Sequence, residues 1–117
     1  MPDLADERCE ACRVGSPPVA DDVLARFQSE YPDWQLVTDD GIRKLRRAFK
    51  FPDFATALAF TDAVGAAAEA ANHHPVLRTE WGRVTVTWWT HKIRDLHRND
   101  LVMSARADRL YEAASSS

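Results

Sequence analysis

The sequence has few cysteines, no surplus of basic residues, and no apolar run that approaches the length of a membrane span. It holds two cysteines in 117 residues, whereas a secreted protein cross-linked by disulfides normally holds more, spread along the chain. A span would need roughly 18 consecutive apolar residues, and the acidic first residues lack the apolar segment of a secretory signal. We therefore expect a cytoplasmic protein with no membrane partner.

The charge balance is slightly acidic. Fifteen Lys and Arg residues against 18 Asp and Glu residues give a formal net charge of −3. A general nucleic-acid binder usually carries a basic surplus, so we expect no nucleic-acid partner. The length is that of one domain, and a domain of this size can form a core without a metal or a disulfide.

The two cysteines, Cys9 and Cys12, form a C-x-x-C motif near the start of the chain. Such a motif can be half of a zinc site or a redox pair. Zinc needs about four ligands, and no second C-x-x-C motif is present to supply them. A redox pair would stand between a strand and a helix rather than in a polar terminal segment. We expect thiols that are exposed or packed locally.

The spacing of apolar residues predicts three helices and about four strands. The expected elements are a helix from residue 20 that Pro32 ends, strands over 34–39 and 42–51, a helix from 52 that His73-His74-Pro75 ends, a short extended segment before Trp81, a strand over 83–90, and a helix from Asn99, its expected N-cap. Asp40-Gly41 favours a two-residue hairpin turn. This order predicts a single α+β domain, an antiparallel sheet with helices packed on one face. We expect a leader over 1–18, the domain over 19–114 and a flexible tail over 115–117.

All four histidines fall between positions 73 and 97. His73 and His74 follow the expected end of the second helix, and a helix C-terminus is negative and stabilises a protonated imidazole. Glu69 lies four residues before His73, so a continuing helix would place its carboxylate one turn below the ring. His91 closes the longest expected strand, on the face that also carries Trp89. If the helix end and the strand end meet, three imidazoles and an indole line one pocket.

Three kinds of chemistry could use such a pocket. Three histidines could bind zinc with a water as the fourth ligand, but neither H-E-x-x-H nor H-x-H occurs. Nucleophilic catalysis would need a nucleophile in an elbow-like motif, and none is present. Metal-free acid–base chemistry on a flat substrate fits best, with tryptophan as a stacking surface. The structural alternative is that the histidines and tryptophans only pack the core.

The residues of this region resemble the signature of the pterin-4a-carbinolamine dehydratases. Three residues separate Glu69 from His73-His74-Pro75, five separate Pro75 from Trp81, nine separate Trp81 from His91, and eight separate His91 from Asp100. Segments 79–91 and 96–100, and the Cys-Glu-Ala-Cys leader, are similar to the bacterial branch that accompanies phenylalanine hydroxylase. The expected element order resembles the family's fold over most of the chain.

The resemblance implies dehydration of 4a-hydroxytetrahydrobiopterin to quinonoid dihydropterin, with no metal and no cofactor. It implies His73, His74 and His91 as the catalytic set, and we hypothesise that His73 acts as the acid. The residues it implies as substrate contacts are Glu69, Pro75, Trp81, Thr90, Lys92 and Asp100. Asp100 also suits the first turn of a helix, so we expect a mixed role for it. The implied partners are the pterin, phenylalanine hydroxylase through a functional link, and further copies of the chain in a homodimer or homotetramer.

Some positions depart from the family pattern. Val76 and Leu77 stand where many members carry an acidic residue and a tryptophan, and Trp81 replaces a common tyrosine. His97 falls where members carry the threonine that caps the third helix, so it is left out of the expected site. Relatives are known as dimerisation cofactors of a transcription factor or as assembly factors of a carbon-fixing enzyme. A non-catalytic binding or transcriptional-cofactor role on the same fold is therefore the alternative function.

Overall fold

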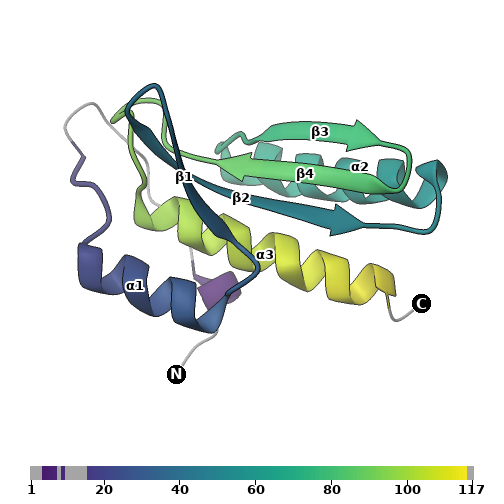
Figure 1. Cartoon of the computed structure of the whole chain (residues 1–117), viewed down its shortest axis with the longest axis horizontal. Helices are drawn as coiled ribbons and strands as arrows, with labels where there is room; N and C mark the ends of the chain where they lie inside the picture. Colours follow the sequence, from purple (N-terminus) through teal and green to yellow (C-terminus); the bar gives the residue numbers. More distant parts are fainter. Residues whose placement is uncertain (1–3, 8, 10–15, 116–117) are drawn as a thin grey trace.

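The computed structural model describes residues 4–7, 9 and 16–115, and within them it confirms the α+β domain that the sequence predicts (Figure 1). Its elements are a 3-10 helix η1 (Leu4–Asp6), then α1 (Asp21–Glu30), β1 (Gln35–Asp39), β2 (Ile42–Lys50), α2 (Phe54–Ala71), β3 (Val76–Glu80), β4 (Arg83–Trp88) and α3 (Arg98–Ser115). Cys12 lies outside the described residues, and Cys9 is half-buried beside the last turn of α2. The boundaries expected for leader, domain and tail stay a prediction.

The four strands form one sheet in the order β1-β2-β4-β3, with every neighbouring pair antiparallel. The turn between β1 and β2 is built by Asp40 and Gly41, whose φ angles of 53° and 77° are those that a primed hairpin turn requires. In the β3–β4 hairpin Val76 pairs with Thr87. The start of β3 and the end of β4 therefore lie at the same end of the sheet, at the left in Figure 1.

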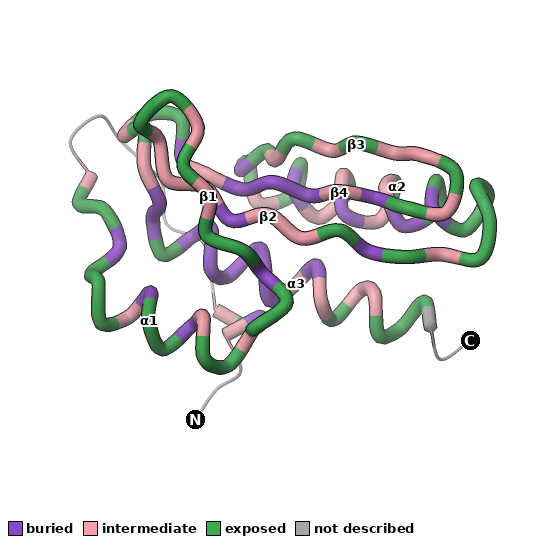
Figure 2. Tube along the Cα trace, in the orientation of Figure 1, coloured by how far each residue is buried: buried purple, intermediate pink, exposed green. Residues whose placement is uncertain are grey.

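One face of the sheet is covered and the other is open. The buried side chains Leu45, Phe49, Val84, Val86 and Trp88 alternate along β2 and β4 and face the helices. Phe49 contacts both Phe60 of α2 and Tyr111 of α3, so both helices pack on this face. Figure 2 shows the buried stretches of β4, α2 and α3 facing one another. No helix among the described residues is long and apolar enough to cross a membrane.

The second helix begins and ends through local side-chain and backbone devices. Asp53 is its N-cap, and its carboxylate accepts the backbone N–H of Thr56 at 2.8 Å. This hydrogen bond, together with one that the Thr56 hydroxyl donates to the same carboxylate, holds the pKa of Asp53 below its usual value. At the other end Asn72 takes a left-handed conformation with φ 51°, so the chain leaves the helix after Ala71.

Part of the expected leader packs on the third helix. Ala5 of η1 is buried, the Glu7 carboxylate accepts two hydrogen bonds of 2.8 Å from the Arg98 guanidinium, and Asp6 accepts one of 2.7 Å from Arg109. The segment 5–7 is thus held along α3, from Arg98 to Arg109.

Candidate functional site

Three segments that are far apart in the sequence converge on the carboxylate of Asp100. The Nε2 atom of His73, just beyond α2, lies 2.6 Å from Oδ1 of Asp100. The hydroxyl of Thr90, just beyond β4, donates to Oδ2 of Asp100 at 2.8 Å. Asp100 itself stands in the first turn of α3 and is fully buried. One carboxylate therefore joins the ends of α2 and β4 to the start of α3.

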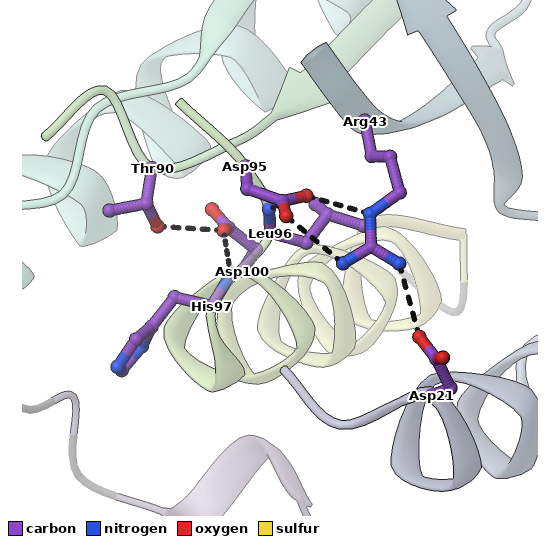
Figure 3. A network of polar contacts seen from close by, with 7 residues as sticks. All are labelled: Asp21, Arg43, Thr90, Asp95, Leu96, His97 and Asp100. Carbon is purple, nitrogen blue, oxygen red and sulfur yellow. Dashed lines mark hydrogen bonds and ion pairs between the residues drawn. The ribbon is translucent and has the colours of Figure 1, made fainter. Parts of the chain in front are cut away.

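The same carboxylate caps the third helix. Oδ2 of Asp100 accepts the backbone N–H of His97 at 2.9 Å, and the ring Nδ1 of His97 accepts the N–H of Asn99 at 3.0 Å. The Thr90–Asp100 and His97–Asp100 contacts are drawn in Figure 3. This reciprocal pattern is a capping box in which a histidine takes the place of serine or threonine. Asn99 as the N-cap was therefore a wrong prediction, since Asn99 lies inside α3 and His97 supplies the cap.

His73 is held on two sides. Its ring is 8% exposed and stacks on the ring of Trp88, with centroids 5.7 Å apart and planes 7° apart. A carboxylate accepts hydrogen bonds and donates none, so the contact with Asp100 places the imidazole proton on Nε2 of His73. In this tautomer Nδ1 carries the lone pair of the ring.

Glu69 contacts His74 rather than His73. Its Oε2 lies 3.4 Å from Nε2 of His74, and both side chains are mostly exposed. The expected contact with His73 assumed a helix that continues to that residue, and the left-handed turn at Asn72 prevents it. The partner of His73 is instead Asp100, which stands 27 residues further along the chain.

His91 lies on the other side of β4. The strand ends at Trp88, two residues before Thr90, so His91 stands in an exposed turn. Its ring centroid is 4.4 Å from that of Trp89, and the ammonium of Lys44 lies 4.1 Å from the centroid of Trp89 on the open face of the sheet. No contact among the described residues joins the three imidazoles to one another, although all three stand at one end of the sheet.

Of the remaining expected site residues, three lie at the end of the sheet that carries His73, His74 and His91, and one lies at the opposite end. Thr90 is buried on Asp100, Pro75 is half-buried between His74 and β3, and Lys92 is exposed in the turn of His91. Trp81 is 74% exposed in the β3–β4 turn, at the opposite end of β4 from His91. Because a six-residue strand spans roughly 20 Å, Trp81 does not join the others within one chain. Among the described residues no three His, Cys, Asp or Glu side chains converge as metal ligands.

The turn between β4 and α3 is tied to the second strand. Arg43 donates to both carboxylate oxygens of Asp95, at 2.7 and 3.1 Å, and also reaches Asp21 of α1 at 3.5 Å (Figure 3). The hydrogen bond from Arg43 holds the pKa of Asp95 below its usual value, although partial burial opposes it. The backbone of Asp95 also accepts the N–H of Thr90. Sequence reasoning missed Arg43 and Asp95, because a pair separated by 52 residues leaves no local pattern. It also passed over His97 as the cap, although the contacts are local and His97 stands at the position of the family's capping threonine.

Comparison with known proteins gives one consistent family. Residues 17–110 match the family model described as pterin 4 alpha carbinolamine dehydratase. A protein of Syntrophotalea carbinolica named "Putative pterin-4-alpha-carbinolamine dehydratase" is 53% identical over 112 residues, covering 96% of this chain and all of that protein. A protein of the same name from Nitrosococcus oceani is 50% identical, over 94% of this chain and 97% of that protein.

Two solved structures share the fold. A transcriptional coactivator/pterin dehydratase from Brucella melitensis superposes with a TM-score of 0.72 at 27% identity, over 81% of this chain and 99% of that one. A pterin dehydratase-like protein described as a RuBisCO assembly factor in the alpha-carboxysome superposes with a TM-score of 0.58 at 25% identity, over 68% of this chain and 89% of that one. The sequences and the fold thus point to the same family.

Proposed function

Because the chain belongs to the pterin-4-alpha-carbinolamine dehydratase family, we propose that it dehydrates 4a-hydroxytetrahydrobiopterin to quinonoid dihydropterin and water. In this reaction the hydroxyl on C4a takes a proton from an acid and leaves as water. The lone pair of N5 forms the N5=C4a double bond, and a base takes the proton from N5. No electrons enter or leave overall, so positioned acid–base groups, which typically give about 10²- to 10⁴-fold acceleration, can carry the reaction.

The observation that carries the proposal is the buried pair of His73 and Asp100. A carboxylate 2.6 Å from Nε2 orients the imidazole and directs Nδ1 toward exchange with a ligand. We assign His73 as the acid for the departing hydroxyl in its doubly protonated form, in which Nε2–H is held by Asp100 and Nδ1 carries the proton that is transferred. We assign His74 and His91, which stand at the same end of the sheet, to the rest of the proton-transfer set.

The proposed substrate contacts surround this set. Thr90 and Asp100 lie against His73, whereas Glu69, Pro75 and Lys92 lie beside His74 and His91. Glu69 beside His74 and the tryptophan ring beside His91 would favour a flat, polar ligand such as a pterin. Trp81 lies at the other end of β4 and cannot contact a pterin bound near His73 in the same chain. We assign it either to the site of a further copy of the chain or to a different role.

The proposed setting is tetrahydropterin recycling in the cytoplasm, with a functional link to phenylalanine hydroxylase and no cofactor. Self-association as a homodimer or homotetramer belongs to the same proposal. It is supported by the apolar side chains Phe54 and Leu58 of α2, which are 45% and 44% exposed. Large exposed apolar side chains that lie together are typical of interaction surfaces.

The second candidate function is a binding or assembly role. The two solved relatives are described as a coactivator and as an assembly factor. The observation that favours such a role here is a groove of about 560 Å³ between α2 and α3. It is lined by Phe51, Phe60 and Leu110, and the exposed Phe54 stands near it in the first turn of α2. This groove lies away from Asp100, so the two functions do not exclude each other.

The proposal is tested by following the decay of freshly made 4a-hydroxytetrahydrobiopterin with wild type, His73→Ala and His91→Ala, each with and without a chelator. We expect wild type to accelerate the decay, both variants to lose about 10²-fold or more in kcat, and the chelator to change nothing. Gln35→Ala, an exposed change on β1, is the control and should match wild type.

Two outcomes would contradict parts of the proposal. If folded wild type leaves the spontaneous decay unchanged, the dehydratase proposal is wrong and the binding role on α2 becomes the better candidate. If His73→Gln keeps near wild-type turnover while His91→Gln abolishes it, the assignment of His73 as the acid is wrong.

A further inference from the structure

Trp88 stands out among the buried aromatic residues because it breaks a rule of core packing. Its side chain is fully buried, and within the described part of the chain its indole N–H has no hydrogen-bond partner. A buried polar group without a partner is costly, and buried tryptophans usually find an acceptor. A leucine or a phenylalanine at this position would fill apolar space without that cost.

The orientation of the Trp88 ring differs from that of the aromatic cluster around Phe49, although Phe27 and Tyr31 elsewhere in the core also stack, with planes 19° apart. The aromatic pairs among Trp34, Phe49, Phe51, Phe60 and Tyr111 meet at angles between 41° and 88°. Trp88 instead lies parallel to the ring of His73, with planes 7° apart. The one aromatic contact of Trp88 among the described residues is therefore a flat stack on an imidazole of the candidate site.

Asp100 alone does not fix the His73 ring. The ring is bonded to the chain at Cγ, and the hydrogen bond at Nε2 holds one further atom loosely, so rotation about the Cβ–Cγ bond can still tilt the plane of the ring. A parallel indole against the ring face removes that rotation. The carboxylate and the indole together define both the position and the plane of the ring, and hence the direction in which Nδ1 points.

We propose that Trp88 is a positioning residue that holds the plane of the His73 imidazole for proton transfer. The inference rests on the proposed function of His73 and goes beyond it, because Trp88 touches His73 and not the reacting atoms. On this proposal the offset stack on the imidazole, with centroids 5.7 Å apart, compensates for the unpartnered N–H.

Two variants separate the stack from the N–H. Trp88→Phe keeps an aromatic face and removes the N–H, so kcat should stay within about 3-fold of wild type. Trp88→Leu keeps an apolar side chain and removes the face, so kcat should fall by about 10- to 100-fold, the loss expected when a catalytic group is displaced by about 1 Å. KM should change by less than about 3-fold in both, because the ligand contacts are untouched.

The matched control is Phe49→Leu, which removes another fully buried aromatic ring from the same sheet face. Phe49 packs on Phe60 and Tyr111, away from Asp100. The variant Phe49→Leu should lower the melting temperature as Trp88→Leu does, while leaving kcat near wild type. A second readout is the NMR spectrum of the His73 ring, whose carbon-bound protons lie beside the stacked indole and should change chemical shift in Trp88→Leu when that ring current is lost.

The two readouts keep this inference distinct from the proposed function. If folded Trp88→Leu keeps wild-type kcat, or if its His73 ring signals do not move, Trp88 does not hold His73 and the inference is overturned. A kcat loss of equal size in Phe49→Leu would overturn it too, because the effect would then be one of general stability. If wild type itself shows no dehydratase activity, the proposed function fails, and the NMR comparison still decides whether Trp88 holds the ring.

Discussion

The imidazoles of His73 and His91 lie on opposite sides of β4 and in opposite surroundings. His73 lies under the helices, stacked on Trp88 and bound to the buried Asp100. His91 lies in an exposed turn, against Trp89, which is covered by the ammonium of Lys44 on the open face. One ring is fixed by the core and the other rests on the surface, although both belong to the same proposed catalytic set.

The difference follows from strand geometry. Successive side chains of a strand point to opposite faces, so the adjacent residues Trp88 and Trp89 send their rings to the covered and the open face. The covered ring is held by packing from α2 and α3, whereas the open ring is not. Exposed side chains change rotamer within picoseconds to nanoseconds. We therefore expect His73 to be oriented before the ligand arrives and His91 to adjust when it binds.

The largest effect is expected from removing the carboxylate that fixes His73. In Asp100→Ala the hydroxyl of Thr90, the N–H of His97 and the ring of His73 lose their buried acceptor. Unpaired buried donors and a lost helix cap should lower the free energy of unfolding by about 2–4 kcal/mol. With its acid unoriented, the enzyme should lose about 10²-fold or more in kcat. Urea denaturation and the dehydratase assay measure the two losses.

Asp62→Ala is the control for this change, because it removes an exposed carboxylate from α2. It should leave both quantities within error of wild type. If folded Asp100→Ala retains wild-type kcat, the buried His73 does not take part in catalysis through Asp100. His91 would then become the leading residue of the proposed set.

An intermediate effect is expected on the turn that carries His91, and it should depend on pH. Arg43 holds the pKa of Asp95 below its usual value of 3.8, so the folded state favours the carboxylate. The resulting stability is present above pH 3.8 and is lost as the pH falls through the lower pKa of the folded protein. For this partly exposed, solvent-screened pair we expect about 0.5–1 kcal/mol. In Asp95→Asn that contribution should be absent at pH 6.

The measurement compares wild type with Asp95→Asn in urea at pH 6 and at pH 3. The two proteins should differ at pH 6 and differ by less at pH 3, because pH 3 lies below 3.8 and the contribution of the ion pair decreases from that pH downward. A gap that persists or widens at pH 3 would show that the Arg43 contact is not what lowers the pKa, and the turn of His91 would not be tied to β2 in this way.

Local patterns were enough to predict the elements. The alternation along β4 is confirmed, since Val84, Val86 and Trp88 face the core, whereas Thr87 on the other face is buried against its neighbour Arg46, which donates to its hydroxyl. The Asp40-Gly41 turn is confirmed because a positive φ at both positions depends only on those two residues. Periodicity and turn chemistry act over a few residues, so they can be read from the sequence itself.

The contacts inside the site could not be predicted in the same way. Spacing placed Glu69 beside His73, but a single left-handed residue, Asn72, moved His74 to that carboxylate. The partner of His73 came from α3, across 27 residues, and only tertiary packing sets that distance. Family resemblance brought Asp100 into the expected site, and its place in a first turn suggested a helix-terminus role, yet its contacts with Thr90 and His73 had no local signal in the sequence.

The smallest effect is expected from the cation on the open face. Lys44→Met keeps an apolar stem over Trp89 and removes the ammonium, which also lies 3.6 Å from Asp39. A cation over an indole at a partly exposed site is worth about 0.5–1 kcal/mol, so urea denaturation should show a loss of that size, with kcat within about 3-fold of wild type. Lys50→Met removes an exposed lysine from the same strand and face and should show no loss. If Lys44→Met reduced kcat as strongly as Trp88→Leu, the contacts of Trp89 with Lys44 would orient His91 as firmly as Trp88 orients His73. Exposure would then no longer separate the two histidines.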